Sequence, residues 1–269
     1  MLADPEEVKR LVAERRGFVF DLDGTVYLGD ELIPGAREAV NGLRRAGKRL
    51  AFVSNKPIGR RDDYARKLNR LGIQCARDEV ITSSLVLARY LQRTAPGAQV
   101  YPIAEGAVIQ DLEAHGLAIC HEVERIEVVA ISWGRGFNYE KLNTAYRAAL
   151  RGARLVATNP DRTCPMPGYE LPDCACMIAA IEACTQMSVD PIVGKPSPIM
   201  LHEVLAFLEL EPHECAMVGD RPDTDLLMAD RAGLAGVLVL TGVGRAEDAA
   251  RLSNRPLVLE SVARIAGAL

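Results

Sequence analysis

The sequence lacks long apolar segments and has no excess of basic charge, and these two absences exclude several classes of protein. No run approaches the roughly 18 consecutive apolar residues that a membrane span needs. Residues 1–17 are charged throughout and lack the apolar centre of a secretion signal. The formal net charge of -4 argues against a large basic surface for nucleic acid. We therefore expect a cytoplasmic protein with no nucleic-acid or membrane partner.

Cysteine pairs in the CxxC spacing are also absent. The seven cysteines are odd in number and irregularly spaced, which in a reducing compartment is typical of free thiols that pack as small apolar groups. Four of them lie between Cys164 and Cys184, so a zinc site is an alternative. The CxxC pairs of structural zinc sites are missing there, which favours free thiols.

Two nucleotide-binding signatures are missing as well. No GxxxxGK[ST] sequence occurs anywhere in the chain, which excludes a P-loop. A nicotinamide-binding enzyme would carry GxGxxG after its first strand, but residues 20–25 supply two acids instead. Without a metal, these acids would repel a pyrophosphate.

The pattern of apolar residues predicts an α/β protein with a Rossmann-like, doubly wound parallel sheet. Buried strands alternate with amphipathic helices, and this rhythm places helices on both faces of a parallel sheet. In the first part of the chain the expected strands are 17–22 and 49–54, and the expected helices are 34–46 and 60–71. Near the C-terminus the expected strands are 216–218 and 237–240, with a helix at 225–232 between them.

The middle of the chain has the length and the pattern of a second domain. It contains expected strands at 99–103, 128–132 and 155–158, and expected helices at 85–93, 139–150 and 177–184. We therefore predict a catalytic core formed by residues 1–82 plus 190–269. An α/β cap domain, residues 83–189, is inserted into it.

Asp21 and Asp23 follow the first buried strand and are separated by one residue. One carboxylate at a strand end can attack phosphorus and form a covalent intermediate. The other can protonate the leaving oxygen and later accept a proton from water. The alternative is a structural turn, since Asp and Thr are common caps.

Three further groups lie at the ends of predicted strands or in a proline-restrained loop. Ser54 and Asn55 offer hydrogen-bond donors for phosphate oxygens, although the same pair is also an everyday turn. Lys195, between Gly194 and Pro196, offers a cation that offsets phosphate charge, or is a solvated loop lysine. The acids of residues 219–225 suit Mg²⁺, or form a plain acidic turn.

Together these groups resemble the four signature motifs of the haloacid dehalogenase superfamily. The similarity is greatest to its NagD and p-nitrophenyl-phosphatase branch (subfamily IIA), which has a C2-type cap inserted between the second and third motifs. The matching segments are DLDGTVYLGDELIPGA (21–36), ATNPD (157–161), VGKPSP (193–198) and MVGDRPDTD (217–225). The resemblance implies a magnesium-dependent phosphatase that forms an aspartyl-phosphate.

The resemblance also implies a role for each matched residue. Asp21 is the expected nucleophile and Asp23 the general acid and base. Mg²⁺ would be held by Asp21, the backbone carbonyl of Asp23 and Asp220, with Asp225 in support. The phosphate would be bound by Ser54, Asn55 and Lys195, and the cap loop that faces the substrate would contain Asn159 and Asp161. The resemblance further suggests a homodimer formed through the cap.

The substrate and some alternatives remain open at this point. Residues 171–177 (LPDCACM) stand where related sequences have a glycine-rich stretch. The resemblance therefore does not imply how this cap segment packs or pairs between subunits. We expect a small phosphorylated metabolite, with sugar phosphates first and nucleoside monophosphates such as UMP next. A dehalogenase has no need for Asp23, and a phosphomutase would place its cap between the first two motifs. A catalytically silent binding protein on the same fold is the remaining alternative.

Overall fold

The structure is a computed structural model that describes residues 2–166 and 169–269, and the chain divides into two compact units. Unit 1 comprises residues 1–54, 61–81 and 201–269, and unit 2 comprises residues 55–60 and 82–200. The expected core and cap ranges differ from these units chiefly at 55–60 and 190–200. Both segments join unit 2 because Asn55 hydrogen-bonds to Asp161 and Lys195, and because Ile192 pairs with Ala157.

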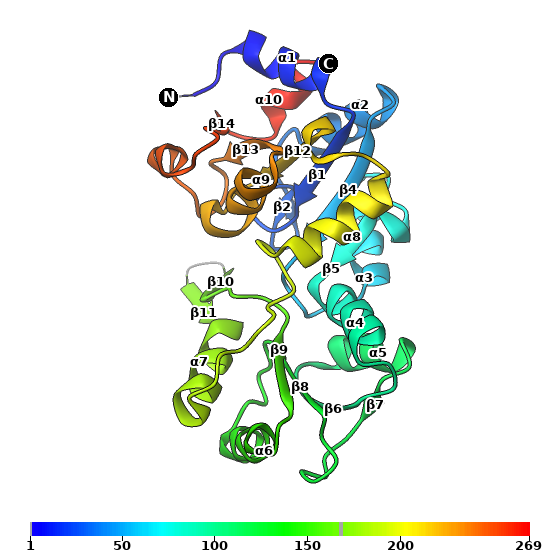
Figure 1. Cartoon of the computed structure of the whole chain (residues 1–269). Helices are drawn as coiled ribbons and strands as arrows, with labels where there is room; N and C mark the ends of the chain where they lie inside the picture. The colour runs from blue at the N-terminus through cyan, green and yellow to red at the C-terminus, as the bar shows by residue number, and fades with distance from the viewer. Residues whose placement is uncertain (1, 167–168) are drawn as a thin grey trace. The chain divides into compact units, whose positions relative to one another are not determined.

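Unit 1 is built on a six-stranded sheet whose centre is the first strand of the chain (Figure 1). The strand order is β14 (Leu257–Leu259), β13 (Ala235–Val239), β12 (Cys215–Gly219), β1 (Gly17–Asp21), β4 (Arg49–Ser54) and β5 (Val80–Thr82). From β14 to β4 every neighbouring pair is parallel. The chain adds β4 on one side of β1 and β12 on the other, so the strand order reverses beside β1. Ligands of such sheets bind outside the carboxyl ends of the strands at this point.

Strand β1 is buried along its whole length, as its apolar sequence requires. Phe20 lies opposite Phe52 of β4 and Val218 of β12, and the rings of Phe20 and Phe52 are 6.0 Å apart between centroids. At the start of the strand, a Cβ on Gly17 would lie 2.7 Å from the end of the Leu210 side chain, so a larger residue there would displace this side chain.

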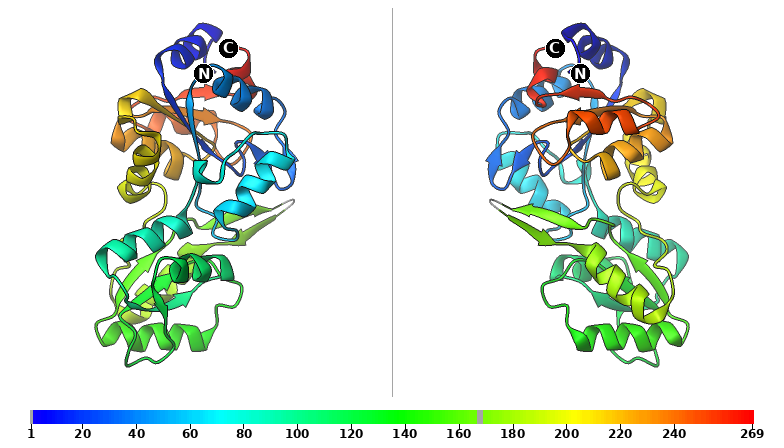
Figure 2. Two further views of the ribbon diagram at one scale, coloured as in Figure 1. Left: turned by 90° about the vertical axis from the view of Figure 1, so that its right-hand side faces the viewer. Right: turned by 90° about the vertical axis from the view of Figure 1, so that its left-hand side faces the viewer.

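The helices of unit 1 bury one face each, following the spacing of their apolar residues. They are α1 (Pro5–Glu14), α2 (Ala36–Arg45), α3 (Arg61–Arg70), α9 (Leu227–Ala232) and α10 (Ala263–Ala266), and α8 (Pro198–Leu208) leads back into this unit. Asp4 caps α1 through the Glu7 N–H, and Glu7 returns a bond to Asp4, which is a reciprocal capping box. Both termini lie in unit 1, next to α1 and α10 (Figure 2).

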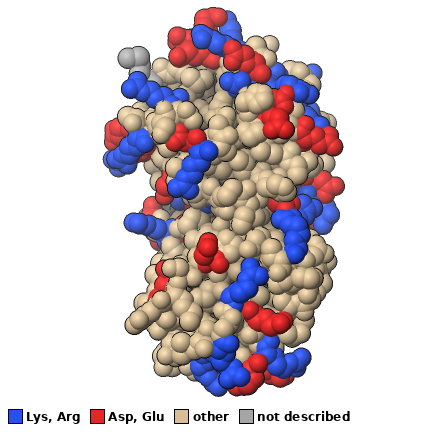
Figure 3. All heavy atoms as spheres, in the orientation of Figure 1, with Lys and Arg blue, Asp and Glu red and all other residues tan. Residues whose placement is uncertain are grey.

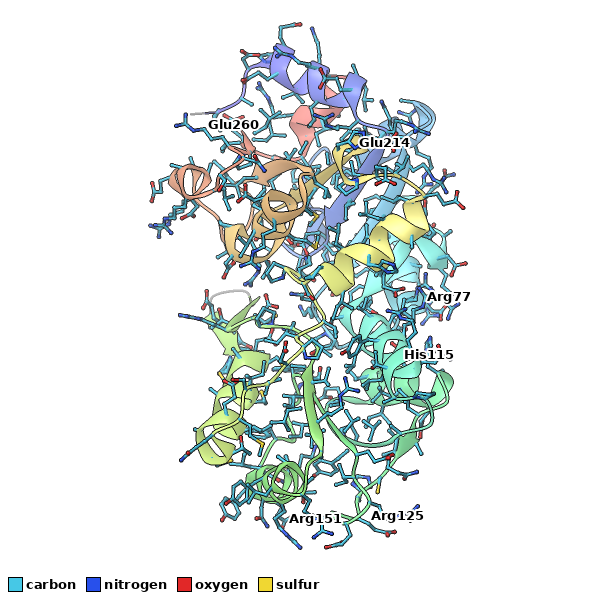
Figure 4. All side chains as sticks on the ribbon, in the orientation of Figure 1. Arg77, His115, Arg125, Arg151, Glu214 and Glu260 are labelled. Atoms are coloured by element: carbon cyan, nitrogen blue, oxygen red, sulfur yellow. The ribbon has the colours of Figure 1, made fainter. Side chains whose placement is uncertain are left out.

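The amino ends of β1 and β12 are tied together by an ion pair. Glu214, labelled in Figure 4, lies in the turn before β12 and pairs with the Arg16 guanidinium. The Arg16 N–H also donates to the Glu214 carbonyl at 2.8 Å. These contacts fix the register of the two strands at the end opposite their functional carboxyl ends.

Unit 2 contains its own four-stranded parallel sheet and a hairpin. The sheet order is β7 (Ala118–Ile119), β6 (Gln99–Ile103), β8 (Val128–Ile131) and β9 (Arg154–Ala157). Its helices are α4 (Ser83–Thr94), α5 (Gly106–Ala114), α6 (Tyr139–Leu150) and α7 (Cys174–Thr185). Strands β10 (Thr163–Met166) and β11 (Tyr169–Pro172) form an antiparallel hairpin, and Trp133 donates to the Pro172 carbonyl at 3.0 Å. This arrangement and that of unit 1 confirm the predicted α/β class.

The cysteines are free thiols throughout, as expected. Burial raises the pKa of Cys174 to about 12, so this thiol stays protonated at neutral pH. In the described parts of the chain, the cysteines form no group that could hold a metal ion.

Two further observations concern the surface and the helices. On the face drawn in Figure 3, Lys and Arg residues are interspersed with Asp and Glu residues. Among the described residues, no helix combines the length and the apolar character needed to cross a membrane.

Candidate functional site

Three aspartates of unit 1 converge at the carboxyl ends of two adjacent strands. Asp21 is the last residue of β1, and Asp220 directly follows β12. Asp225 lies in the single π-helical turn Pro222–Leu226 that comes next. One carboxylate oxygen from each residue lies within 4.8 Å of the others, and all three side chains are buried. The point of strand reversal therefore carries three acidic side chains.

Backbone N–H groups hold the two later carboxylates in place. The Asp220 Oδ2 atom accepts a hydrogen bond from the Val243 N–H at 2.8 Å, and the Asp220 carbonyl accepts one from Gly244 at 2.8 Å. The Asp225 Oδ2 atom accepts a bond from the Arg221 N–H at 3.1 Å. Asp223, the remaining acid of this motif, is exposed and is not part of the group.

Glycines surround the carboxylates because no larger residue fits. A Cβ at Gly242 would lie 1.9 Å from Asp220 Oδ2, and one at Gly24 would lie 2.7 Å from the same atom. A Cβ at Gly219 would lie 2.3 Å from Asp225 Oδ2. The loop with Val243 and Gly242 was not predicted from the sequence. In the sequence, the one indication of this loop is the glycine-rich segment TGVG (241–244), which follows the predicted strand 237–240.

Asp23 lies in a tight turn between β1 and a short hairpin, β2 (Tyr27–Leu28) and β3 (Glu31–Leu32). The Val26 N–H donates to the Leu22 carbonyl at 2.9 Å, and Gly24, with φ of +89°, donates to the Tyr27 carbonyl at 2.8 Å. A left-handed φ of this kind strains residues other than glycine. The turn therefore requires the glycine of the DxDGT motif.

The phenol of Tyr27 is a neutral neighbour of these acids. Burial, followed by the charge of Asp23, raises the pKa of Tyr27 well above its usual value. The Lys67 ammonium lies 3.7 Å from the centre of the Tyr27 ring. The hydroxyl therefore stays protonated at physiological pH.

The three clustered carboxylates of unit 1 fit a small divalent cation. Three buried carboxylates this close together repel one another unless a positive charge lies among them. Hard oxygen ligands in this density suit Mg²⁺, which is usually held by one or two carboxylates together with water and phosphate oxygens. Asp21, Asp220 and Asp225 are the residues that would hold it, and the expected Asp23 carbonyl belongs to the adjoining turn.

The expected phosphate-binding residues are divided between the two units. Ser54 is the buried last residue of β4, next to β1 in the sheet of unit 1. Asn55 and Lys195 belong to unit 2, where the structure brings them together with Asn159 and Asp161. All four of these side chains are buried.

Asn55 is the centre of this second group. Its Nδ2 atom donates to the Asp161 carboxylate at 2.8 Å and to the Lys195 carbonyl at 3.0 Å. Its Oδ1 atom accepts the Lys195 N–H at 2.9 Å. The Asn159 Nδ2 atom donates to the same Asp161 oxygen at 2.8 Å.

A cavity of about 130 Å³ lies in unit 2 close to this group. It is lined by Lys56, Pro57, Ile58, Trp133, Arg135, Cys164, Leu171 and Asp173. Asp173 links it to the polar group, because Asp173 accepts a hydrogen bond from Asn159 at 3.4 Å. The Arg135 guanidinium lies 5.2 Å from the Trp133 ring. Trp133 packs in the apolar core of unit 2 and also lines the cavity.

Comparisons with known proteins identify one family. A family model described as haloacid dehalogenase-like hydrolase matches residues 18–118, and one described as HAD-hydrolase-like matches residues 192–265. The sugar-phosphatase AraL of Bacillus subtilis (strain 168) is 36% identical over 246 residues, which cover 91% of this chain and 90% of that protein.

Solved structures of two phosphatases are similar over nearly the whole chain. The p-nitrophenyl phosphatase from Archaeoglobus fulgidus has a TM-score of 0.89 at 32% identity and covers 95% of this chain and 100% of its own. The glycerol phosphate phosphatase Rv1692 from Mycobacterium tuberculosis, in complex with magnesium, has a TM-score of 0.86 at 32% identity. It covers 95% of this chain and 77% of its own.

We expect Gly242→Ala to weaken the binding of Mg²⁺, because the added Cβ displaces the Asp220 carboxylate. Mg²⁺ should raise the melting temperature of the parent protein, since a ligand that binds only the folded state stabilises it. That rise should be much smaller in Gly242→Ala, as measured by calorimetry across a Mg²⁺ titration. Gly106→Ala is the matched control, because a Cβ there meets open space. An equal rise in all three proteins would contradict the assignment of Asp220.

Proposed function

The chain is a phosphatase of the haloacid dehalogenase-like hydrolase family, and we propose that it hydrolyses small phosphomonoesters with Mg²⁺ through an aspartyl-phosphate on Asp21. The observation that carries this proposal is the group of three buried carboxylates at the carboxyl ends of β1 and β12. Such a group is suited to a divalent cation and to a phosphate that shares it. Gly24, Gly219 and Gly242 let the backbone pass close to these carboxylates, where a Cβ would collide with Asp220 or Asp225.

In the first half of the reaction, an Asp21 oxygen attacks phosphorus. The bond from phosphorus to the leaving oxygen breaks, and Asp23 donates a proton to that oxygen, so that a neutral alcohol leaves. The phosphoryl group remains as an acyl-phosphate on Asp21.

In the second half, water attacks the phosphorus of the acyl-phosphate. Asp23, now a carboxylate, accepts a proton from this water, and the bond between phosphorus and the Asp21 oxygen breaks. Asp21 is regenerated as a carboxylate, and inorganic phosphate is released. One residue acts first as an acid and then as a base, so that a single turnover returns both aspartates to their starting state.

Positive charge and hydrogen-bond donors complete the site. When bound, Mg²⁺ supplies the charge that lets an anionic carboxylate approach an anionic phosphate. Asp21, Asp220 and the backbone carbonyl of Asp23 would hold the ion, with Asp225 in support. Ser54, Asn55 and Lys195 bind the phosphate oxygens, and Asn159 and Asp161 come from the cap loop.

Sugar phosphates are the preferred substrates in this proposal. A relative 36% identical to this chain is named a sugar-phosphatase.

Two alternatives are tested by the same experiments. A nucleoside monophosphatase acting on UMP would use the same core chemistry with a different leaving group. A silent binding protein would keep the fold without turnover. A cytoplasmic location and a homodimer formed through the cap also stay predictions.

Asp21→Asn should abolish hydrolysis of p-nitrophenyl phosphate, because an amide is a poor nucleophile. Release of nitrophenolate by the purified protein is measured with Mg²⁺ and after addition of a chelator. The parent should be active only with the metal. The variant should keep the parent circular dichroism spectrum, and full activity in it would rule out Asp21 as the nucleophile.

Asp23→Asn should lower turnover on the order of 10²–10⁴-fold, the usual contribution of a proton-transfer residue. The loss should be largest for alcohol leaving groups, which need a proton, and smaller for nitrophenolate, which leaves unprotonated. Steady-state rates with glycerol phosphate and p-nitrophenyl phosphate provide the measurement. A variant as fast as the parent on both would refute the acid and base role.

A panel of phosphorylated metabolites should show higher kcat/KM for hexose and pentose phosphates than for nucleoside monophosphates. The reason is the similarity of the chain to a relative that is named a sugar-phosphatase. Release of inorganic phosphate is measured for each compound at equal concentration. A clear preference for UMP over every sugar phosphate would reverse this order.

A further inference from the structure

The side chain of Asn55 makes with Lys195 the pair of hydrogen bonds that a neighbouring strand would make. It accepts the Lys195 N–H at 2.9 Å and donates to the Lys195 carbonyl at 3.0 Å. Its remaining amide hydrogen is directed to Asp161 at 2.8 Å. Each polar atom of the Asn55 amide is thus committed to a protein partner, since a primary amide offers two hydrogens and one carbonyl oxygen.

Asp161 fixes the orientation of this amide. A single carboxylate oxygen, Oδ2, accepts from both Asn55 and Asn159, each at 2.8 Å. Because Asp161 Oδ2 accepts hydrogen bonds, it can face the NH₂ group of Asn55 but not the amide oxygen, and this keeps the amide in one orientation. Its carbonyl oxygen must then face the Lys195 N–H. Bonds to a charged acceptor are stronger than those between neutral groups.

A buried chain of side chains supports Asp161 from behind. Asn159 also donates to Asp173 at 3.4 Å, and its own Oδ1 accepts from the Thr158 hydroxyl at 2.7 Å. Asp173 in turn accepts from the N–H of Cys174 at 2.6 Å, the first residue of helix α7. The chain from α7 to Lys195 therefore runs Asp173, Asn159, Asp161, Asn55. We name it the Asn55–Asp161 relay.

The backbone around Lys195 is shaped to receive the relay. The Gly194 N–H donates to the Thr158 carbonyl at 2.7 Å. A Cβ at Gly194 would lie 2.3 Å from that carbonyl and 2.6 Å from Asn55 Oδ1. Only glycine at this position lets the amide reach the backbone of Lys195. The Asn55 carbonyl is fixed as well, because it accepts from the Ser83 hydroxyl at 2.9 Å.

We propose that Asn55 and Asp161 are positioning residues that act through Lys195, and that the Asp161 carboxylate does not contact the leaving group. The proposal rests on the proposed function, in which the Lys195 ammonium binds the phosphate. The relay fixes the backbone from which this long side chain extends. The contribution of Asn55 to phosphate binding is then through its backbone N–H, while its amide holds Lys195.

The substrate dependence of a variant separates this role from direct contact with the substrate. Every phosphomonoester carries the phosphate that Lys195 binds, so a displaced Lys195 lowers kcat/KM for all of them by a similar factor. A carboxylate that binds leaving-group hydroxyls would matter for sugar phosphates and not for p-nitrophenyl phosphate. Inorganic phosphate, which has no leaving group, reports only on the groups that bind phosphate, Lys195 among them.

The test compares Asp161→Leu with Asp161→Asn in the full chain with Mg²⁺. Leucine removes the acceptor, and we expect kcat/KM to fall about 10²-fold for both p-nitrophenyl phosphate and a sugar phosphate, the scale of a misplacement near 1 Å. The dissociation constant of inorganic phosphate, measured by titration calorimetry, should rise about tenfold. Asparagine keeps an oxygen at the same place and should restore both quantities to within about threefold of the parent.

Asn69→Ala is the matched control for a purely structural loss. Asn69 binds the backbone of Cys75 in the same way, donating to its carbonyl at 2.8 Å and accepting its N–H at 3.4 Å. This variant should lower the melting temperature without changing phosphate affinity. Asp161→Leu should change phosphate affinity in the protein that remains folded.

Three outcomes would contradict either the role of Asp161 or the proposed phosphatase function, and the outcomes differ between the two. A loss confined to sugar phosphates, with unchanged phosphate affinity, would make Asp161 a leaving-group contact and refute the relay. Parent values in Asp161→Leu for every quantity would refute it too. If the parent hydrolysed no phosphomonoester, the proposed function would fail. Weaker phosphate binding by Asp161→Leu would even then support the link from Asp161 to Lys195.

Discussion

Repulsion among three buried carboxylates is the constraint on which the active end of unit 1 depends. One oxygen each of Asp21, Asp220 and Asp225 lies within 4.8 Å of the others. Two unit charges at such a distance repel by on the order of 3 kcal/mol at an effective dielectric constant of 20. Backbone N–H groups of Arg221 and Val243 offset part of this cost. A divalent cation offsets far more, so a site that is unfavourable when empty binds its metal strongly.

The parallel sheet makes this concentration of charge possible. Strands β1 and β12 are held in register from their amino ends, where Arg16 pairs with Glu214, to the acids at their carboxyl ends. Glycines at position 24, at the end of β12 and at position 242 let three polypeptide segments approach the carboxylates without a Cβ between them. In unit 2, a side chain rather than a neighbouring strand holds a functional segment of backbone in place. There the Asn55 amide, rather than a strand, holds the backbone of Lys195.

Much of this arrangement could be predicted from the sequence because strand ends are visible in it. The apolar runs before Asp21 and Asp220 mark buried strands, and the carboxyl ends of parallel strands meet at one edge. Other features carry no such signal. The N–H of Val243 is a backbone group, and Asp223 and Asp225 look alike in the sequence although only Asp225 is buried. The direction of the Asn55 amide follows from Asp161, which lies 106 residues away in the chain. A tertiary contact of this kind leaves no local pattern.

Binding of Mn²⁺ in place of Mg²⁺, followed by electron paramagnetic resonance, shows whether Asp21, Asp220 and Asp225 form a site for a divalent cation. The free ion gives a strong signal that diminishes on binding, so the number of sites and their affinity are measured without turnover or substrate. We predict one tight site in the parent and the loss of that site in Asp220→Asn, with the fold preserved in both. An equal number of sites with equal affinity in the two proteins would contradict it.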